Sequence, residues 1–187
     1  RKNSNHVYAL CSLVNYKSFH SVQISTDMGK TWQIVTDSDT PNLLGRYKGT
    51  GGDSQTGQGW YDLCLAVHPN NTNTIHTGGI NIWKSGNFGY SWDMNTHWVG
   101  YYNKPYVHAD IHDMEYQNNS TKLFAAHDGG IDYTTNGGSS WHFISEGMSI
   151  TQFYSVDISQ SGEEYILAGS QDNGTSRYQN GKWTHVG

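Results

Sequence analysis

One eight-residue turn pattern recurs along this chain and constrains its fold more than any other feature of the sequence. The pattern reads S/T-x-D/N-x-G-x-S/T-W, and its three copies occupy residues 25–32, 85–92 and 134–141. The copies end in tryptophans that are 60 and then 49 residues apart, namely Trp32, Trp92 and Trp141. A shorter version ends 42 residues later at Trp183. Such near-regular spacing indicates an architecture built by repeating one supersecondary unit.

The residue types of this pattern suit a tight turn between two strands. The third position holds an oxygen-bearing side chain that can accept hydrogen bonds from backbone N–H groups further along the turn: Asp27, Asn87 and Asn136. The fifth position holds a residue that adopts a positive φ without strain: Gly29, Gly89 and Gly138. The final tryptophan offers a large apolar face for packing between sheets. We therefore expect the third residues to be structural, to contact no ligand, and the three tryptophans to be largely buried.

The same order of short, strand-like segments surrounds each copy of the pattern. Four such segments, separated by hairpin signals, occur in each of three stretches, approximately 60–96, 107–145 and 152–187. A fourth stretch, 6–36, holds only the last three segments of the set. No part of the chain reads as a long helix. Four antiparallel strands repeated in this way predict an all-β fold, a β-propeller with about three complete blades and one partial blade, forming a single region over 1–187.

Composition excludes several classes of function. Only 14% of the residues are charged, against about 25% in ordinary soluble domains, and the net charge is −5. The 11 basic residues are scattered, so we expect no binding to nucleic acid. No apolar run approaches the roughly 18 residues of a membrane helix, so we expect no membrane insertion. Cys11 and Cys64 lie on strand-like segments. Two buried thiols are the favoured interpretation, and a disulfide between them is the alternative.

The repeats resemble the Asp-box, or BNR, repeats of β-propellers. Similar repeats occur in sialidases, in the sortilin ectodomain and in xyloglucanase-like secreted bacterial proteins. The last group is the most similar over residues 61–175, in the pieces DLCLAVHPNNTNTIHTGG, VHADIH, AAHDGGIDYTTNGGSSW and ITQFYSVDISQSGEEYILAGSQDNGT. The resemblance implies a propeller and a secreted or cell-surface location, but it does not specify a function, because this fold carries many.

The number of blades is the next expectation. The resemblance implies six or more blades, whereas this chain holds about four. We therefore expect a fragment of a larger propeller, with further blades or domains in the parent chain. A small ring of four blades is the alternative. The missing first strand of the unit at 6–36 favours the fragment.

Polar residues gather where the topology predicts one end of the propeller. In a four-stranded meander, the turn between the second and third strands lies at the same end as the connection between blades, and the repeated turn lies at the other. Candidate binding residues at the first end are His108, His112, His127, Gln171, Asn173, Trp60, Tyr101 and Tyr102. Candidate catalytic residues there are Asp110, Asp128 and Asp172. We expect His108, Asp110 and His112 to open an inner strand, with alternation placing all three on one side.

Each of these groups has a structural interpretation beside the functional one. The His108-x-Asp110-x-His112 pattern offers metal ligands, but on a strand its histidines would be about 13 Å apart, so a shared ion is the less favoured reading and no cofactor is expected. Paired carboxyls permit glycoside hydrolysis, although turn aspartates usually serve backbone hydrogen bonding. The aromatic residues could stack on sugars, anchor a protein or pack between blades.

The leading functional hypothesis is an extracellular or cell-surface interaction module that binds a protein or a glycan through its loop-rich face. The alternative is a secreted glycoside hydrolase that uses carboxylates of the same face. Carboxyl geometry separates the two, because two carboxyls facing each other across a cleft would indicate a hydrolase. Sialidase chemistry is disfavoured, since the resemblance would require an arginine triad and the sequence has only Arg1, Arg46 and Arg177.

Overall fold

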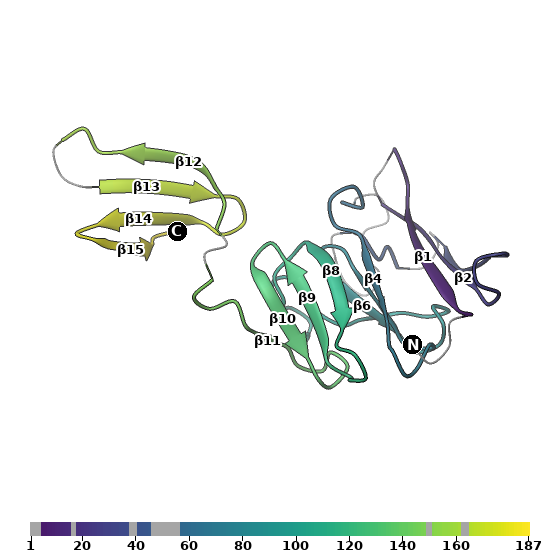
Figure 1. The fold of residues 1–187 in the computed structure, drawn as a ribbon. Coiled ribbons are helices and arrows are strands. Elements are labelled where there is room, and N and C mark those ends of the chain that lie inside the picture. Colours follow the sequence, from purple (N-terminus) through teal and green to yellow (C-terminus); the bar gives the residue numbers. More distant parts are fainter. Residues whose placement is uncertain (1–4, 16–17, 38–40, 46–56, 149–150, 162–164) are drawn as a thin grey trace. The chain divides into compact units, whose positions relative to one another are not determined.

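The computed structural model describes residues 5–15, 18–37, 41–45, 57–148, 151–161 and 165–187. The chain divides into two compact units, Arg1–Glu146 and Gly147–Gly187, which are described separately (Figure 1). The described residues form strands and turns, and no helix among them is long and apolar enough to cross a membrane.

The first unit contains three antiparallel sheets, in each of which consecutive strands pair with one another (Figure 1). The first sheet has three strands: β1 (Val7–Ser12), β2 (Phe19–Ser25) and β3 (Gln33–Asp37). The second has four: β4 (Cys64–Val67), β5 (Ile75–Gly78), β6 (Ile82–Ser85) and β7 (Asp93–Met94). The third also has four: β8 (Ile111–Tyr116), β9 (Leu123–His127), β10 (Gly130–Thr134) and β11 (His142–Phe143). Each sheet lies within one stretch that the sequence predicts to form a blade.

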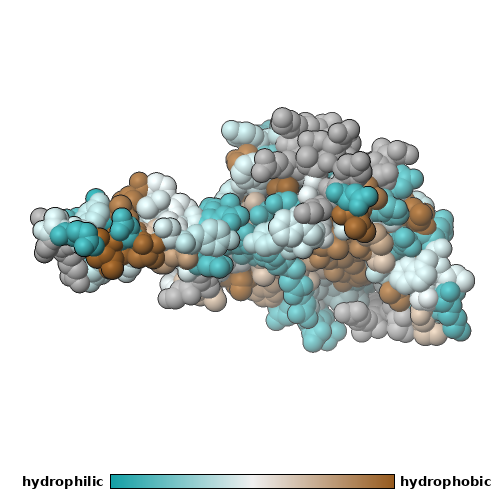
Figure 2. Space-filling model, turned by 90° about the horizontal axis from the view of Figure 1, so that it is seen from above, coloured by the Kyte–Doolittle hydropathy of each residue, from teal (hydrophilic) through white to brown (hydrophobic). Residues whose placement is uncertain are grey.

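The second unit is a single antiparallel sheet of four strands: β12 (Phe153–Ile158), β13 (Tyr165–Ser170), β14 (Thr175–Gln179) and β15 (Lys182–His185). Few of its side chains are buried, Ala168 being one of them. Large apolar side chains, among them Val156, Ile158 and Trp183, are exposed, and Figure 2 shows hydrophobic residues at the surface of this unit. A lone sheet has two faces and cannot bury either without a second layer, so nothing within this unit covers them.

One hydrogen bond to the third residue recurs in all three copies of the repeated turn. Its third residue accepts a hydrogen bond from a backbone N–H four residues on, with distances of 2.9, 2.9 and 3.0 Å at Asp27, Asn87 and Asn136, as the sequence predicts. The fifth residue has a positive φ in every copy, between 87° and 93°. At Asp27, the backbone N–H and the hydroxyl of Thr31, followed by the Ser25 hydroxyl, lower the carboxyl pKa to about 2.

The prediction that all three turn tryptophans are buried is wrong for Trp32. Trp92 is 9% exposed, and its indole N–H donates to the Thr36 hydroxyl of β3, in the preceding sheet, at 2.9 Å. Trp141 is partly buried and packs on the apolar cluster between the second and third sheets. Trp32 is 44% exposed, because each tryptophan covers the sheet before its own and no sheet precedes the first one among the described residues.

Two apolar clusters hold the first unit together. One joins the first two sheets and includes Phe19, Val22, Ile75 and Trp83. The other joins the second and third sheets and is built from the following buried residues: Ala66, Ile82, Val107, Ile111, Met114, Leu123 and Ala125. Stacking of neighbouring sheets through such clusters is how blades of a propeller become stable, since one sheet alone buries too little.

The two cysteines are free, which agrees with the favoured reading of the sequence. Both cysteine residues are partly exposed rather than fully buried. Burial is nevertheless the main reason why the pKa of the Cys64 thiol rises to about 12, so this thiol is protonated at neutral pH.

Candidate functional site

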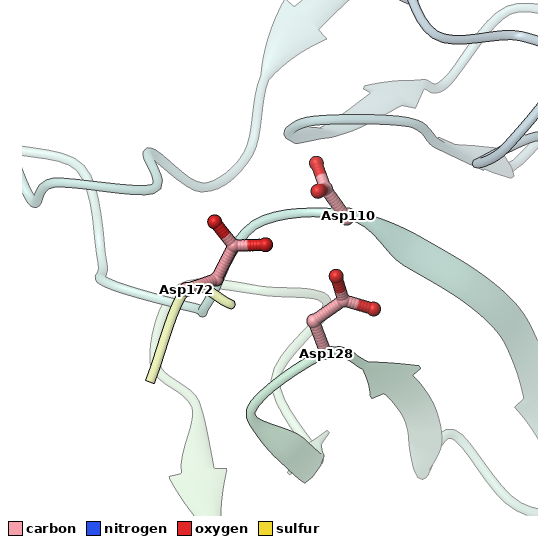
Figure 3. A group of neighbouring side chains, drawn as sticks. All are labelled: Asp110, Asp128 and Asp172. Atoms are coloured by element: carbon pink, nitrogen blue, oxygen red, sulfur yellow. The ribbon is translucent and has the colours of Figure 1, made fainter. Parts of the chain in front are cut away.

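Two of the predicted carboxylates meet at one end of the third sheet (Figure 3). Asp110 comes directly before β8, Asp128 comes directly after β9, and the pairing of Ile111 with His127 brings them into adjacent register. A carboxylate oxygen of Asp110 lies within 4.8 Å of one of Asp128. The repeated turn of this sheet joins β10 to β11 and therefore lies at the opposite end. The sequence predicted this separation correctly.

The prediction that His108, Asp110 and His112 share one side of a strand is wrong. The strand β8 begins only at Ile111, and Asp110 has a left-handed φ of 65°. A bulge between Ile111 and Asp113 then interrupts the alternation at His112. Local backbone irregularities of this kind redirect side chains, and period-two reasoning cannot anticipate them.

Asp128 is held by two donors from different parts of the chain. The hydroxyl of Tyr61 donates to its two oxygens at 3.0 and 3.2 Å, and Nε2 of His112 lies 2.5 Å from Oδ1. The rings of Tyr61 and His112 meet edge to face, with centroids 4.8 Å apart. Tyr61 belongs to the segment before β4, so this contact links the second sheet to the third.

Asp62 is the residue that sequence reasoning missed. It follows Tyr61 in a turn in which the Gln58 carbonyl accepts hydrogen bonds from the N–H groups of both residues, at 2.6 and 2.9 Å. Its side chain is fully buried, and its carboxyl lies beside that of Asp110. Burial is the largest cause that raises its pKa, to about 8, and the nearby carboxyl of Asp110 is the next. Asp62 is therefore mainly protonated at neutral pH.

Asp110 is close to each of the other two carboxyls. It is 8% exposed, and its Oδ1 accepts a hydrogen bond from the side-chain amide of Gln58 at 2.9 Å. The carboxyl of Asp110 raises the pKa of Asp62 more than the carboxyl of Asp128 does. The three carboxyls form the acidic cluster, defined as Asp62, Asp110 and Asp128. Such a cluster can share a proton or hold a cation, because three carboxylates brought together without compensation repel one another.

A second pair of polar residues supports the turn that carries Asp128. Nδ1 of His127 accepts a hydrogen bond from the Gly129 N–H at 3.1 Å, so its Nε2 bears the proton and donates to Asp132 at 2.9 Å. His127 and Asp132 are buried. The ring of His108 stacks on His127 with centroids 5.7 Å apart and planes 11° from parallel. The rings of these two histidines are thus packed against each other, and their role in binding stays a prediction.

Gly129 allows this stacking. A Cβ at this position would lie 2.6 Å from the ring of His108, which is closer than any real contact. Gly129 is therefore required by packing, independently of the role of Asp128.

Exposed aromatic side chains lie on the connections between sheets, at the same end of the sheets as the acidic cluster. Trp60 and Tyr101 are 65% and 63% exposed, and Tyr102 is also exposed. Trp60 precedes β4, whereas Tyr101 and Tyr102 belong to the connection from β7 to β8, so all three lie at the end that carries Asp110. Buried His97 packs against Tyr101 and Tyr102, with ring centroids 5.7 and 5.5 Å away. The two tyrosine rings are thus supported from below, whereas the Trp60 ring packs against that of Tyr61, with centroids 5.5 Å apart.

The remaining predicted residues, Gln171, Asp172 and Asn173, belong to the second unit. They form the turn between β13 and β14, in which the Asn173 N–H donates to the Gln171 carbonyl at 2.8 Å and Asp172 has a φ of 62°. Figure 3 also labels Asp172. Its participation in a site with Asp110 and Asp128 stays a prediction.

No protein-family model matches the sequence, and no curated protein matches it significantly. Solved structures do resemble it. The GH74 enzyme of Niastella koreensis is 19% identical over 97% of this chain and 28% of its own, with a TM-score of 0.54. The GH74 xyloglucanase of Xanthomonas campestris is 13% identical over 98% of this chain and 29% of its own, with a TM-score of 0.53. YCF48 bound to a D1 peptide is 14% identical over 97% and 51%, with a TM-score of 0.48.

The likenesses to the two GH74 structures establish the fold. The chain forms part of a β-propeller, as three four-stranded antiparallel blades and one three-stranded sheet. It spans about half or less of the length of each of these three neighbours.

Proposed function

We propose that this chain is part of a secreted or cell-surface propeller that binds a glycan through the end carrying the acidic cluster and the exposed aromatic rings. The observation that carries the proposal is the exposure of Trp60, Tyr101 and Tyr102 at that end. Rings held in place by packing from below can stack on sugar faces at little cost in conformational entropy. Secretion belongs to the proposal because the repeats resemble those of secreted propellers.

The surroundings of these rings favour a glycan. The segments 57–61 and 95–106 contain a single charged residue, Lys104, together with several Asn, Gln, Thr and Tyr side chains. Uncharged hydrogen-bonding groups beside aromatic rings match the hydroxyls and apolar faces of a sugar. A protein partner is the second candidate, because exposed Trp and Tyr residues are also typical hot spots of protein interfaces.

The carboxyl geometry argues against hydrolysis. Retaining glycosidases hold two carboxyls about 5–5.5 Å apart and inverting ones about 6.5–9.5 Å apart, on either side of the scissile bond. Here Asp62 is fully buried and Asp110 nearly so, and oxygens of Asp110 and Asp128 approach within 4.8 Å. Asp128 is thus the one partly exposed carboxyl of the cluster, and a single accessible carboxyl cannot flank a scissile bond from both sides. Binding without bond cleavage is therefore the proposed activity.

The test is a binding measurement on soluble polysaccharides, starting with xyloglucan and other β-glucans, by affinity electrophoresis and calorimetry. Trp60→Ala and Tyr101→Ala should each weaken binding at least about tenfold, the effect expected for an interface hot spot. The control is Tyr90→Ala, which removes an equally exposed ring from a repeated turn at the opposite end. Equal affinity in all three variants, or release of reducing ends by the wild-type chain, would contradict the proposal.

A further inference from the structure

The segment 57–62, which precedes β4, is attached to the third sheet by polar side-chain contacts. The side-chain amide of Gln58 donates to Oδ1 of Asp110 at 2.9 Å, and the Tyr61 hydroxyl donates to an oxygen of Asp128 at 3.0 Å. Both acceptors are carboxyl groups at the same end of β8 and β9 (Figure 3). Two side chains of the segment thus hold it to one end of the third sheet.

A third contact of this segment needs a proton. The carboxyl of Asp62 hydrogen-bonds to that of Asp110, and the two side chains are fully and almost fully buried. Ionised carboxylates have only acceptor oxygens, so a hydrogen bond between two carboxyls requires that one of them be protonated. Without that proton, two like charges lie side by side where little water screens them, and they repel each other. The geometry therefore couples the attachment of the segment to one bound proton.

The groups around Asp62 favour its protonated form. The carboxyls of Asp110 and Asp128 both act on it and disfavour its ionisation. His112 faces Asp128, with Nε2 2.5 Å from Oδ1. The thiol of Cys64, in β4, is protonated at neutral pH, because burial raises its pKa to about 12. Burial and the neighbouring carboxyls raise the pKa of Asp62 to about 8, so its proton leaves at mildly alkaline pH.

We propose that the proton shared by Asp62 and Asp110 holds the segment 57–62 against the third sheet, and that loss of this proton releases the Trp60 ring from its binding position. The Trp60 ring packs on that of Tyr61, with centroids 5.5 Å apart, so a movement of the segment displaces it. A ring that is no longer held in place binds more weakly, because the ligand must order it again. The consequence for glycan binding rests on the function proposed above, whereas the release of the segment does not.

The release is measured first without any ligand. In protein labelled with 5-fluorotryptophan, the ¹⁹F signal of Trp60, assigned by its loss in Trp60→Phe, should shift between pH 6.5 and pH 9 with a midpoint at about pH 8. In Asp62→Asn this shift should disappear, because the amide N–H can donate to Asp110 at any pH. The control is Asp93→Asn, which changes an exposed carboxyl of β7 and should shift as the wild-type chain does.

The second measurement is the calorimetric affinity for xyloglucan at the same two pH values. The wild-type chain and Asp93→Asn should bind at least about fivefold more weakly at pH 9, because most molecules have then lost the proton. Asp62→Asn should bind equally at both. A Trp60 signal that does not change with pH in the wild-type chain, or changes equally in Asp62→Asn, would overturn the proposal, as would equal xyloglucan affinity of the wild-type chain at both pH values. If the Trp60 signal titrates while xyloglucan does not bind, the proposed function fails and the release of the segment stands.

Discussion

At the scale of single residues, Asp62 departs furthest from the ordinary behaviour of its type. An exposed aspartate is ionised at neutral pH, whereas burial and the neighbouring Asp110 raise the pKa of Asp62 to about 8. The sequence contains no local sign of this. Asp62 stands between Tyr61 and Leu63 at the start of a strand-like segment, and only the packing of the third sheet against this segment brings Asp110 to it. Long-range neighbours of this kind are invisible to motif reasoning.

The shifted pKa makes stability depend on pH. The pKa of Asp62 rises from 3.8 to about 8 on folding, so the folded chain binds the proton more tightly. Its contribution to the free energy of unfolding is fully present below about pH 4 and is lost as the pH rises to about 8. In Asp62→Asn, this part of the pH dependence should disappear, and the variant should be the more stable protein at pH 9. Urea denaturation at pH 5, 7 and 9 in EDTA measures this, and parallel pH profiles for both proteins would contradict the assignment.

At the scale of elements, the repeated turn shows what the sequence could predict and what it could not. Hydrogen bonds at Asp27, Asn87 and Asn136 depend on residues within four positions, and the pattern predicted them correctly. Burial of the turn tryptophans depends on the neighbouring sheet, so the prediction was wrong for Trp32. The prediction that His108, Asp110 and His112 share one side of a strand was wrong for a local reason, because a bulge replaces the regular alternation.

Trp92 and Trp32 should contribute different amounts to the free energy of unfolding, because their neighbours differ. Trp92→Ala removes a buried ring that packs on the first sheet and should lower the free energy of unfolding by about 3–5 kcal/mol. Trp32→Ala removes a similar ring that is 44% exposed, and it should cost clearly less. Chemical denaturation of the two variants gives the comparison. Equal losses would mean that Trp32 is covered in solution.

Two glycines of the repeated turns provide a second matched pair. Gly138 has a φ of 89°, and a Cβ there would lie 1.8 Å from Oδ1 of Asn95 in the preceding sheet. Gly86 has open space around it and no positive φ. Gly138→Ala should therefore destabilise the chain by about 2 kcal/mol or more, through backbone strain and displacement of Asn95, whereas Gly86→Ala should have almost no effect. Thermal unfolding of both variants tests the contrast, which a similar shift in each would refute.

At the scale of the whole molecule, the chain has the sheets of a partial propeller. The three-stranded first sheet and the exposed apolar faces of the second unit are surfaces that further blades would cover in a larger ring. The parent protein is proposed to supply those blades. The repeat spacing was sufficient to predict the blades and the end at which Asp110 and Asp128 meet, because both depend only on strand order.

The central claim is that ligand binds at the end carrying Trp60 and not at the end carrying the repeated turns. Trp98, in the connection from β7 to β8, lies at the same end as Trp60. The chain has seven tryptophans, and their indole N–H groups give separate signals in a ¹H–¹⁵N NMR spectrum. Titration with the glycan identified by affinity electrophoresis should shift the Trp60 and Trp98 signals, both from exposed rings, and leave that of exposed Trp32 unchanged. A shift confined to Trp32, with Trp60 and Trp98 unaffected, would place the ligand at the wrong end and contradict the account.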